Sequence, residues 1–137
     1  MAARKRRSQG ARNTVDSLSL SRACAVSAAD KLADEIVVLD LRGLTYVTDF
    51  FVIVTGRNAR QVGAIAAAVK ENMDKAGQRP IGIQGAEASG WVLLDYADVV
   101  VHVFSREARK LYDLELLWGD APRVEFRPGR QATTNDE

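Results

Sequence analysis

Cysteine and histidine are nearly absent from this chain of 137 residues, which holds one of each. A lone cysteine cannot form an internal disulfide, and a zinc site of the Cys and His kind needs several such ligands, so neither is predicted. Long apolar runs are also missing. None approaches the roughly 20 residues of a transmembrane helix, and no apolar core of the secretory kind follows the basic start, so neither a membrane span nor export is predicted.

The charges are divided unevenly, although the net charge of the whole chain is only +1. Residues 1–29 hold six basic residues and one acid, whereas residues 30–137 hold thirteen basic and seventeen acidic residues. An acidic body suits a basic protein partner better than it suits a nucleic acid gripped over the whole surface. The sequence therefore predicts no sequence-specific nucleic-acid partner.

Residues 1–26, rich in Arg, Ser and Ala, are predicted to form a disordered basic tail that includes Cys24. Three interpretations of the tail stay open. It is a plain solvated segment, or Arg4 to Arg7 touch phosphates without sequence preference, or the stretch is an organellar transit peptide. Residues 127–137 are predicted to be a second disordered tail, which leaves residues 27–126 as one domain.

The first part of this domain is predicted as a helix and two strands. Ser27 is placed to cap a short helix over residues 28–35. The β-branched run that follows predicts a strand over residues 36–41. Residues 49–55 are apolar on both faces, which is typical of a covered central strand.

Asn58 is predicted to cap the next helix, with Gln61 completing the capping box, and Gly77 to end it in the left-handed conformation. The helix carries one apolar stripe at helical period, formed by Val62, Ile65, Ala66, Val69 and Met73. A short strand over residues 81–83 then completes a strand–helix–strand unit.

Two apolar runs within residues 91–104 predict an antiparallel hairpin with a four-residue turn that starts at Asp95. Val99, Val101 and Val103 share one face of the second strand and should be core. Ser105 is predicted to cap a last helix over residues 106–117, whose apolar stripe is Leu111, Leu114 and Trp118. The expected fold is α/β, a five-stranded mixed sheet covered by helices.

Few residues are arranged for catalysis. His102 lies among valines with no nucleophile motif, and is predicted to be a packed histidine or one on a surface face, without a catalytic role. Asp40, Asp49, Asp95 and Asp98 lie at predicted strand ends, where paired acids could bind magnesium. The two hairpin acids are better explained as turn residues. The remaining candidates are aromatic side chains, which serve equally as interface anchors or as core: Trp91, Tyr96, Tyr112 and Trp118.

About two-thirds of the chain resembles the ribosomal silencing factor family of Iojap-like proteins. The matching segments, in order, are residues 40–44, 48–56, 91–104 and 111–121. The resemblance implies a fold similar to that of nucleotidyltransferases without their catalytic motif. Such enzymes carry a Gly-Ser turn followed by Asp-x-Asp, whereas this chain has Gly56-Arg57 and no Asp-x-Asp.

The resemblance implies a translational repressor of the bacterial cytoplasm that is not an enzyme and uses no cofactor or metal. Such a repressor binds the large ribosomal subunit through large ribosomal subunit protein fourteen, blocks joining of the small subunit and lowers translation under nutrient limitation. A homodimer is also compatible with the resemblance. The expected docking surface combines the hairpin with the last helix: Trp91, Asp95, Tyr96, Asp98, His102, Tyr112, Glu115 and Trp118.

Two other hypotheses compete with repression by docking. One is a metal-dependent nucleotidyl or phosphoryl transferase that uses Asp40, Asp49 or Asp95. The other is an RNA-binding accessory protein that works through Arg4 to Arg7. The sequence also leaves open whether Trp91 and His102 face outward or lie beneath the last helix.

Overall fold

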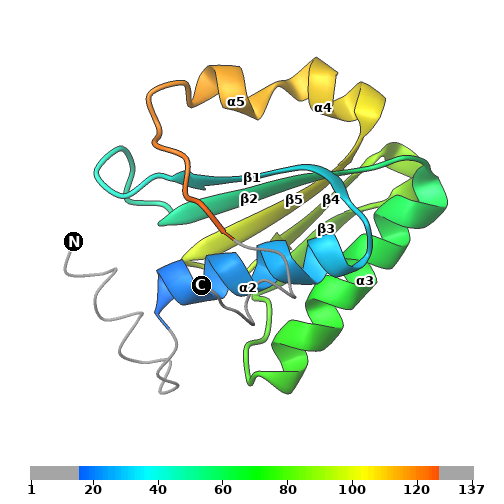
Figure 1. Cartoon of the computed structure of the whole chain (residues 1–137), viewed down its shortest axis with the longest axis horizontal. Helices are drawn as coiled ribbons and strands as arrows, with labels where there is room; N and C mark the ends of the chain where they lie inside the picture. Colours follow the sequence, from blue (N-terminus) through cyan, green and yellow to red (C-terminus); the bar gives the residue numbers. More distant parts are fainter. Residues whose placement is uncertain (1–15, 127–137) are drawn as a thin grey trace, which may run out of the picture.

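The computed structural model describes residues 16–126, in which helices cover both faces of a five-stranded mixed sheet with strand order β1-β2-β5-β4-β3 (Figure 1). The strands are β1 (Asp34–Asp40), β2 (Phe50–Gly56), β3 (Gly82–Ala86), β4 (Trp91–Asp95) and β5 (Val99–Ser105). The helices are α2 (Ser17–Asp30), α3 (Ala59–Lys75), α4 (Arg106–Tyr112) and α5 (Leu114–Leu117), with a 3-10 turn, η1 (Glu87–Ser89). The predicted α/β class and five-stranded mixed sheet are confirmed.

Each face of the sheet has its own core because alternate side chains of a strand point to opposite faces. On the face covered by α2 and α3, the predicted valines of β5 join apolar residues of β2 and both helices. On the other face, Ile53 and Phe104 pack with Leu39 and Ala108 beneath α4 and α5. Figure 1 shows the two helix pairs on opposite sides of the sheet. The core assignment of Val99, Val101 and Val103 is confirmed.

Helix α2 corrects the prediction for residues 17–26, which are helical and not a tail. Asp16 caps the helix by accepting from the Ser19 amide at 2.7 Å. Cys24 is fully buried in the core beneath it. The predicted helix over residues 28–35 is wrong, since α2 ends at Asp30 and β1 begins at Asp34. Residues 1–15 and 127–137 lie outside the described residues.

The central helix is confirmed in detail. The side chain of Asn58 accepts from the Gln61 amide at 2.9 Å, while Gln61 reaches back to the Arg57 amide and not to the cap residue itself. All five stripe residues are buried, and Gly77 has φ +83°. Helix α3 joins β2 to the parallel strand β3, and β5 and β4 lie between those two strands.

The β4–β5 hairpin is confirmed, but its turn is tighter than predicted. The Tyr96 amide donates to the Val99 carbonyl at 2.8 Å, and the Asp98 amide donates to the Tyr96 carbonyl at 2.9 Å. Ala97, between them, adopts a left-handed φ of +72°. The side chain of Asp95 supports this turn by accepting from the Ala97 amide at 2.8 Å.

The predicted last helix is broken in two. Ser105 caps α4 as expected, accepting from the Ala108 amide at 3.1 Å. Asp113 then adopts φ +40°, which ends α4, and α5 starts as a separate helix at Leu114. The break turns Leu111 outward, so that 74% of its surface is exposed, and its place in an apolar stripe is wrong. Leu114 and Trp118 do pack toward the sheet.

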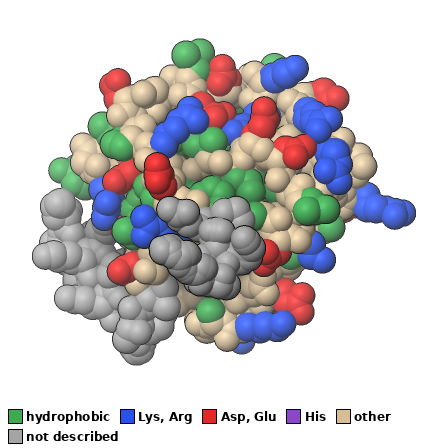
Figure 2. Space-filling view, in the orientation of Figure 1, with side chains coloured by type: hydrophobic (Ala, Val, Ile, Leu, Met, Phe, Trp, Pro, Cys, Tyr) green, Lys and Arg blue, Asp and Glu red, His purple; other side chains and the backbone are tan. Residues whose placement is uncertain are grey.

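The surface of the described residues carries both signs of charge. Residues 16–126 contain twelve basic and sixteen acidic side chains, a net charge of −4. In the view of Figure 2, Lys and Arg are interspersed with Asp and Glu, and apolar side chains show between them. No helix among residues 16–126 has the length and apolar character needed to cross a membrane.

Candidate docking site

An aromatic cluster, formed by Phe51, Trp91, His102, Phe104, Tyr112 and Trp118, lies between the sheet and the α4–α5 segment. The ring of Trp91 packs against that of Tyr112 with centroids 4.4 Å apart, and against Phe104 at 5.0 Å. Phe51 meets His102 edge-on at 4.5 Å and Trp118 at 6.1 Å. The sequence left the direction of Trp91 and His102 open, and both lie on the α4–α5 face.

His102 anchors the indole ring of Trp91. The indole Nε1–H donates to His102 Nδ1 at 3.2 Å, so in the neutral imidazole the proton sits on Nε2. Only 4% of the surface of His102 is exposed, and this burial lowers its pKa to about 4. The histidine is therefore neutral at physiological pH and can accept this hydrogen bond continuously.

Trp91 and Tyr112 form one wall of a surface pocket of about 240 Å³. Leu93 adds apolar surface, and the rest of the lining comes from Gln84, Gly85 and Ser89. Tyr112 is 48% exposed, whereas Trp91 is partly buried. A large aromatic side chain held beside a concave apolar surface is the arrangement common at the centre of protein interfaces. We call this feature the Trp91 pocket.

A buried arginine fixes the helices that cover the cluster. Arg109, 8% exposed, donates to Thr55 Oγ1 at 2.8 Å and to the Glu35 carbonyl. Its guanidinium also donates to both carboxylate oxygens of Glu115 at 3.0 Å. This hydrogen bonding lowers the pKa of the Glu115 carboxyl. Glu115, predicted as a docking residue, is thus engaged within the chain, where it ties α5 to α4 across the break.

Tyr96 does not share the surface of Trp91, and this part of the prediction is wrong. Its side chain is 7% exposed and packs in the core on the α2–α3 face. Burial raises the pKa of its hydroxyl above the usual value. Trp91 and Tyr96 are five positions apart, so the strand alternation of β4 places them on opposite faces, and Tyr96 follows Val92 and Leu94 into the α2–α3 core.

The four acids lie at the end of the sheet away from Trp91. Asp40 pairs with Phe50, and Phe50 with Val99, whereas Trp91 pairs with Phe104 at the other end. Asp95 and Asp98 flank the turn at the acidic end. Asp98 is therefore separated from Trp91 by the length of the β4–β5 hairpin, whereas Asp95 shares the strand face of Trp91 and is two positions from Leu93, which lines the pocket.

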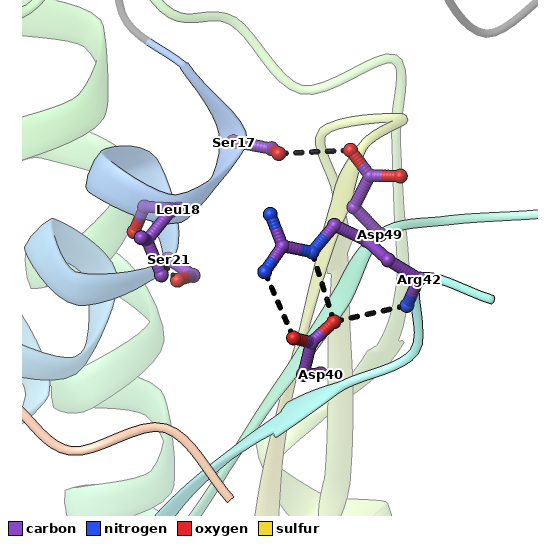
Figure 3. A network of polar contacts seen from close by, with 6 residues as sticks. All are labelled: Ser17, Leu18, Ser21, Asp40, Arg42 and Asp49. Atoms are coloured by element: carbon purple, nitrogen blue, oxygen red, sulfur yellow. Dashed lines mark hydrogen bonds and ion pairs between the residues drawn. The ribbon is translucent and has the colours of Figure 1, made fainter. Parts of the chain in front are cut away.

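Local partners hold the acids of that end (Figure 3). Arg42 donates to both oxygens of Asp40, at 3.0 and 2.9 Å, and these bonds lower the pKa of the carboxyl. Ser17, at the start of α2, donates to Asp49 at 2.8 Å. Among the described residues, no group of three or more His, Cys, Asp or Glu side chains is placed to hold a metal ion.

Sequence reasoning missed part of the pocket lining. Leu93 could have been predicted as a lining residue, because it is two positions from Trp91 and shares its face of the strand. Gln84, Gly85 and Ser89 carried no such signal. Gln84 and Gly85 reach the pocket because β3 pairs with β4, with Ala86 opposite Trp91 and Gln84 opposite Leu93. Ser89 belongs to η1, which connects the two strands.

Comparison with known proteins gives one consistent result. Residues 14–137 match the family model described as ribosomal silencing factor during starvation. The chain is 42% identical over 108 residues to ribosomal silencing factor RsfS of Bacillus subtilis, covering 79% of this chain and 92% of that protein. It is 45% identical over 103 residues to RsfS of Halalkalibacterium halodurans, covering 74% and 88% respectively.

A solved structure supports the same assignment. The crystal structure of a protein from Chromobacterium violaceum superimposes with a TM-score of 0.74 at 34% identity, covering 85% of this chain and 96% of that one. The fold and the sequence similarity therefore extend together over most of both chains. This chain belongs to the ribosomal silencing factor family.

Proposed function

We propose that this protein represses translation by binding the large ribosomal subunit with the surface around the Trp91 pocket. The observation that carries the proposal is the pairing of Trp91 with Tyr112 at the edge of an open apolar pocket. Trp and Tyr are the residues most enriched at energetically dominant interface positions. The relatives are named ribosomal silencing factors, which supports a ribosomal partner for this protein.

The partner within the subunit is, in this proposal, large ribosomal subunit protein fourteen. Occupation of the face where the small subunit docks would block subunit joining by steric exclusion and lower translation when nutrients are short. No bond-making step is needed, so the protein would act without catalysis or a cofactor. The described body has a net charge of −4, which favours encounter with a basic ribosomal protein.

We assign docking to a smaller set of residues than the sequence suggested. Trp91 and Tyr112 would contact the partner from the pocket. Trp118, which packs against Phe51 on the same face of the sheet, would extend this surface. His102 and Glu115 would act from inside, the first by orienting Trp91 and the second by holding α5. Because the bacterial relatives are ribosome-silencing proteins, we place this activity in the bacterial cytoplasm.

Sedimentation of Tyr112→Ala with purified large subunits tests the proposal. Loss of an interface anchor of this kind should cost about 2 kcal/mol of binding, which is roughly thirty-fold in affinity. Joined ribosomes should then reappear in sucrose gradients at protein concentrations where the unaltered protein suppresses them. The same experiment with the unaltered protein reports whether subunit joining is blocked at all.

Tyr46→Ala is the matched control. Tyr46 is 71% exposed and lies in the loop between β1 and β2, at the opposite end of the sheet from Trp91. Its removal should leave sedimentation unchanged. Equal binding by both variants would overturn the assignment of the docking surface, and failure of the unaltered protein to bind large subunits would overturn the function.

A further inference from the structure

The two edges of the sheet differ in whether another segment of the chain covers them. The edge at β1 is covered by the segment after α5, because the Asp40 amide donates to the Pro122 carbonyl and the Val124 amide to the Val38 carbonyl, each at 2.8 Å. Leu39 and Arg123 form an antiparallel bridge between them. Strand β3, at the other edge, pairs only with β4 among residues 16–126. One edge of the sheet is therefore closed and the other is open.

The open edge lacks the usual protection against pairing. Native edge strands are commonly guarded by charged side chains, proline or a covering segment. Strand β3 has the sequence Gly-Ile-Gln-Gly-Ala, which contains no charge and no proline. Ile83 is 46% exposed there, and Ile81, just before the strand, is 73% exposed. Only Gly85, with φ +87°, interrupts the regular backbone. An unguarded apolar edge is a ready template for another strand.

The open edge is continuous with the Trp91 pocket. Gln84 and Gly85 belong to β3 and also line the pocket beside Trp91 and Tyr112. A polypeptide that runs along β3 can therefore place a side chain in the pocket. The pocket would recognise a side chain and the edge would form main-chain hydrogen bonds. In strand-addition sites these two kinds of contact give specificity and affinity respectively.

We propose that an extended segment of the ribosomal partner pairs with β3 and adds a sixth strand to the five-stranded sheet. This inference rests on the proposed function, because it takes the same partner. The alternative occupant is a second copy of this chain pairing edge to edge. Charge favours the first, since two bodies of net charge −4 repel each other, whereas a basic ribosomal protein complements that charge.

Amide hydrogen exchange tests the proposal directly. The protein, labelled with ¹⁵N, is followed by NMR alone and with purified large ribosomal subunit protein fourteen. Outward amides of residues 82–86 should exchange at least about tenfold more slowly in the complex, because pairing removes them from water. Amides of Tyr46 and Val47, in the loop at the far end of the sheet, report any general change.

Each outcome decides a different point. Slower exchange confined to residues 82–86 and their neighbours supports strand addition. Binding that depends on Tyr112 but leaves these amides unchanged overturns strand addition and spares the proposed function. If the ribosomal protein does not bind, both proposals fail. If the amides slow on concentration of the free protein alone, a second copy occupies the edge and the proposed occupant is wrong.

A pair of variants gives an independent test. Ile83→Lys places a charge within the open edge and should weaken partner binding about tenfold or more. Ile81→Lys adds the same charge just before the strand, at a residue whose amide already donates to the Asp95 carbonyl at 2.7 Å. It should bind as the unaltered protein does. Equal weakening by both would attribute the effect to charge and count against strand addition.

Discussion

The indole N–H of Trp91 donates to Nδ1 of His102 across the β4–β5 pair, at 3.2 Å. The two residues are diagonal neighbours, because Trp91 pairs with Phe104 and Leu93 pairs with His102. The bond requires an unprotonated Nδ1, and the ring lies between Phe51 and Phe104 at centroid distances of 4.5 and 5.9 Å. The orientation of the pocket tryptophan is thus coupled to the protonation state of a buried base.

This coupling predicts an acid-sensitive stability. The pKa of His102 is about 4 in the folded protein, compared with 6.5 for an ordinary histidine. Between these two pKa values, His102 is protonated in the unfolded chain and neutral in the folded chain. The free energy of unfolding should therefore fall by about 2 kcal/mol between pH 7 and pH 5. The loss should level off below about pH 4, where both states are protonated. Urea titrations at several pH values measure it.

His102→Gln is the control for the pH effect, since glutamine fits a similar position and does not titrate. The variant should show little change in unfolding free energy between pH 5 and 7. Asp40 and Glu115, whose pKa values are lowered, lose their stabilising contribution only below about pH 4.5, outside this window. An imidazole that titrates near pH 6.5 in the folded protein would contradict the prediction.

Alanine substitutions at three glycines distinguish the stability cost of backbone strain from that of steric contact. Gly82→Ala should change stability by less than about 0.5 kcal/mol, because a Cβ there meets nothing within 4 Å. Gly77→Ala meets nothing either, but φ is +83°, so it should cost about 1 kcal/mol. Gly85→Ala combines φ +87° with a Cβ only 2.0 Å from the Trp91 carbonyl oxygen. It should cost more than about 2 kcal/mol.

Thermal unfolding of the three variants measures this order. Because Gly85 lies against the backbone of Trp91, its substitution should also shift the Trp91 indole resonance, whereas those at Gly77 and Gly82 should not. The chain has only two tryptophans, so the indole N–H signals are readily assigned. A Gly85 variant as stable as the Gly82 variant would mean that β3 adopts a different path.

The parts of the fold that were predicted from sequence are those with a strong local period. The stripe of α3 and the two arms of the hairpin carry large apolar side chains in regular order, and both were placed correctly. Helix α2 was missed although Leu20, Cys24, Ala25 and Ala28 are spaced as one helical face. Small side chains give little contrast with the polar residues between them, so packing against the sheet decides the structure there.

The site was predicted less completely because it depends on contacts between distant segments. Nothing local shows that Arg109 is buried, or that Asp113 adopts φ +40° and separates α4 from α5. That break decides which side chains of the last helices face the sheet. Tyr96 differs from these residues, because the alternation of β4 is a local signal that already assigns it to the opposite core from Trp91.

The Arg109–Glu115 pair should contribute measurably to stability. Glu115→Gln leaves a guanidinium that is 8% exposed without its counter-charge. Removing one partner of a fully buried pair costs about 3–5 kcal/mol, and because Glu115 is 23% exposed we expect about 2 kcal/mol. Chemical denaturation measures the loss. The Trp118 indole resonance should broaden as α5 loosens.

Asp34→Asn provides the comparison for an exposed pair. Asp34 accepts from Arg106 at 2.9 Å, but the two side chains are 37% and 55% exposed. Breaking this pair should change stability by less than about 1 kcal/mol. If the two variants lose equal stability, Arg109 does not depend on Glu115 for its charge balance.

Deletions at the N-terminus should distinguish the basic segment from helix α2. A chain that starts at residue 16 keeps Asp16 as the helix cap and should unfold at nearly the same denaturant concentration as the full chain. A chain that starts at residue 27 loses Leu20, Cys24 and Ala25 from the core. Loss of one large buried side chain alone costs about 2–5 kcal/mol, so this chain should not fold cooperatively.

The shorter deletion also tests the RNA-binding hypothesis, which assigns ribosome association to Arg4 to Arg7. A chain that starts at residue 16 should still sediment with large subunits if docking uses the Trp91 pocket. Loss of sedimentation with normal folding would favour the basic segment instead, because phosphate contacts supply affinity that falls steeply with salt. Sedimentation at two salt concentrations therefore separates the hypotheses, whereas deletion to residue 27 would remove the fold along with the segment.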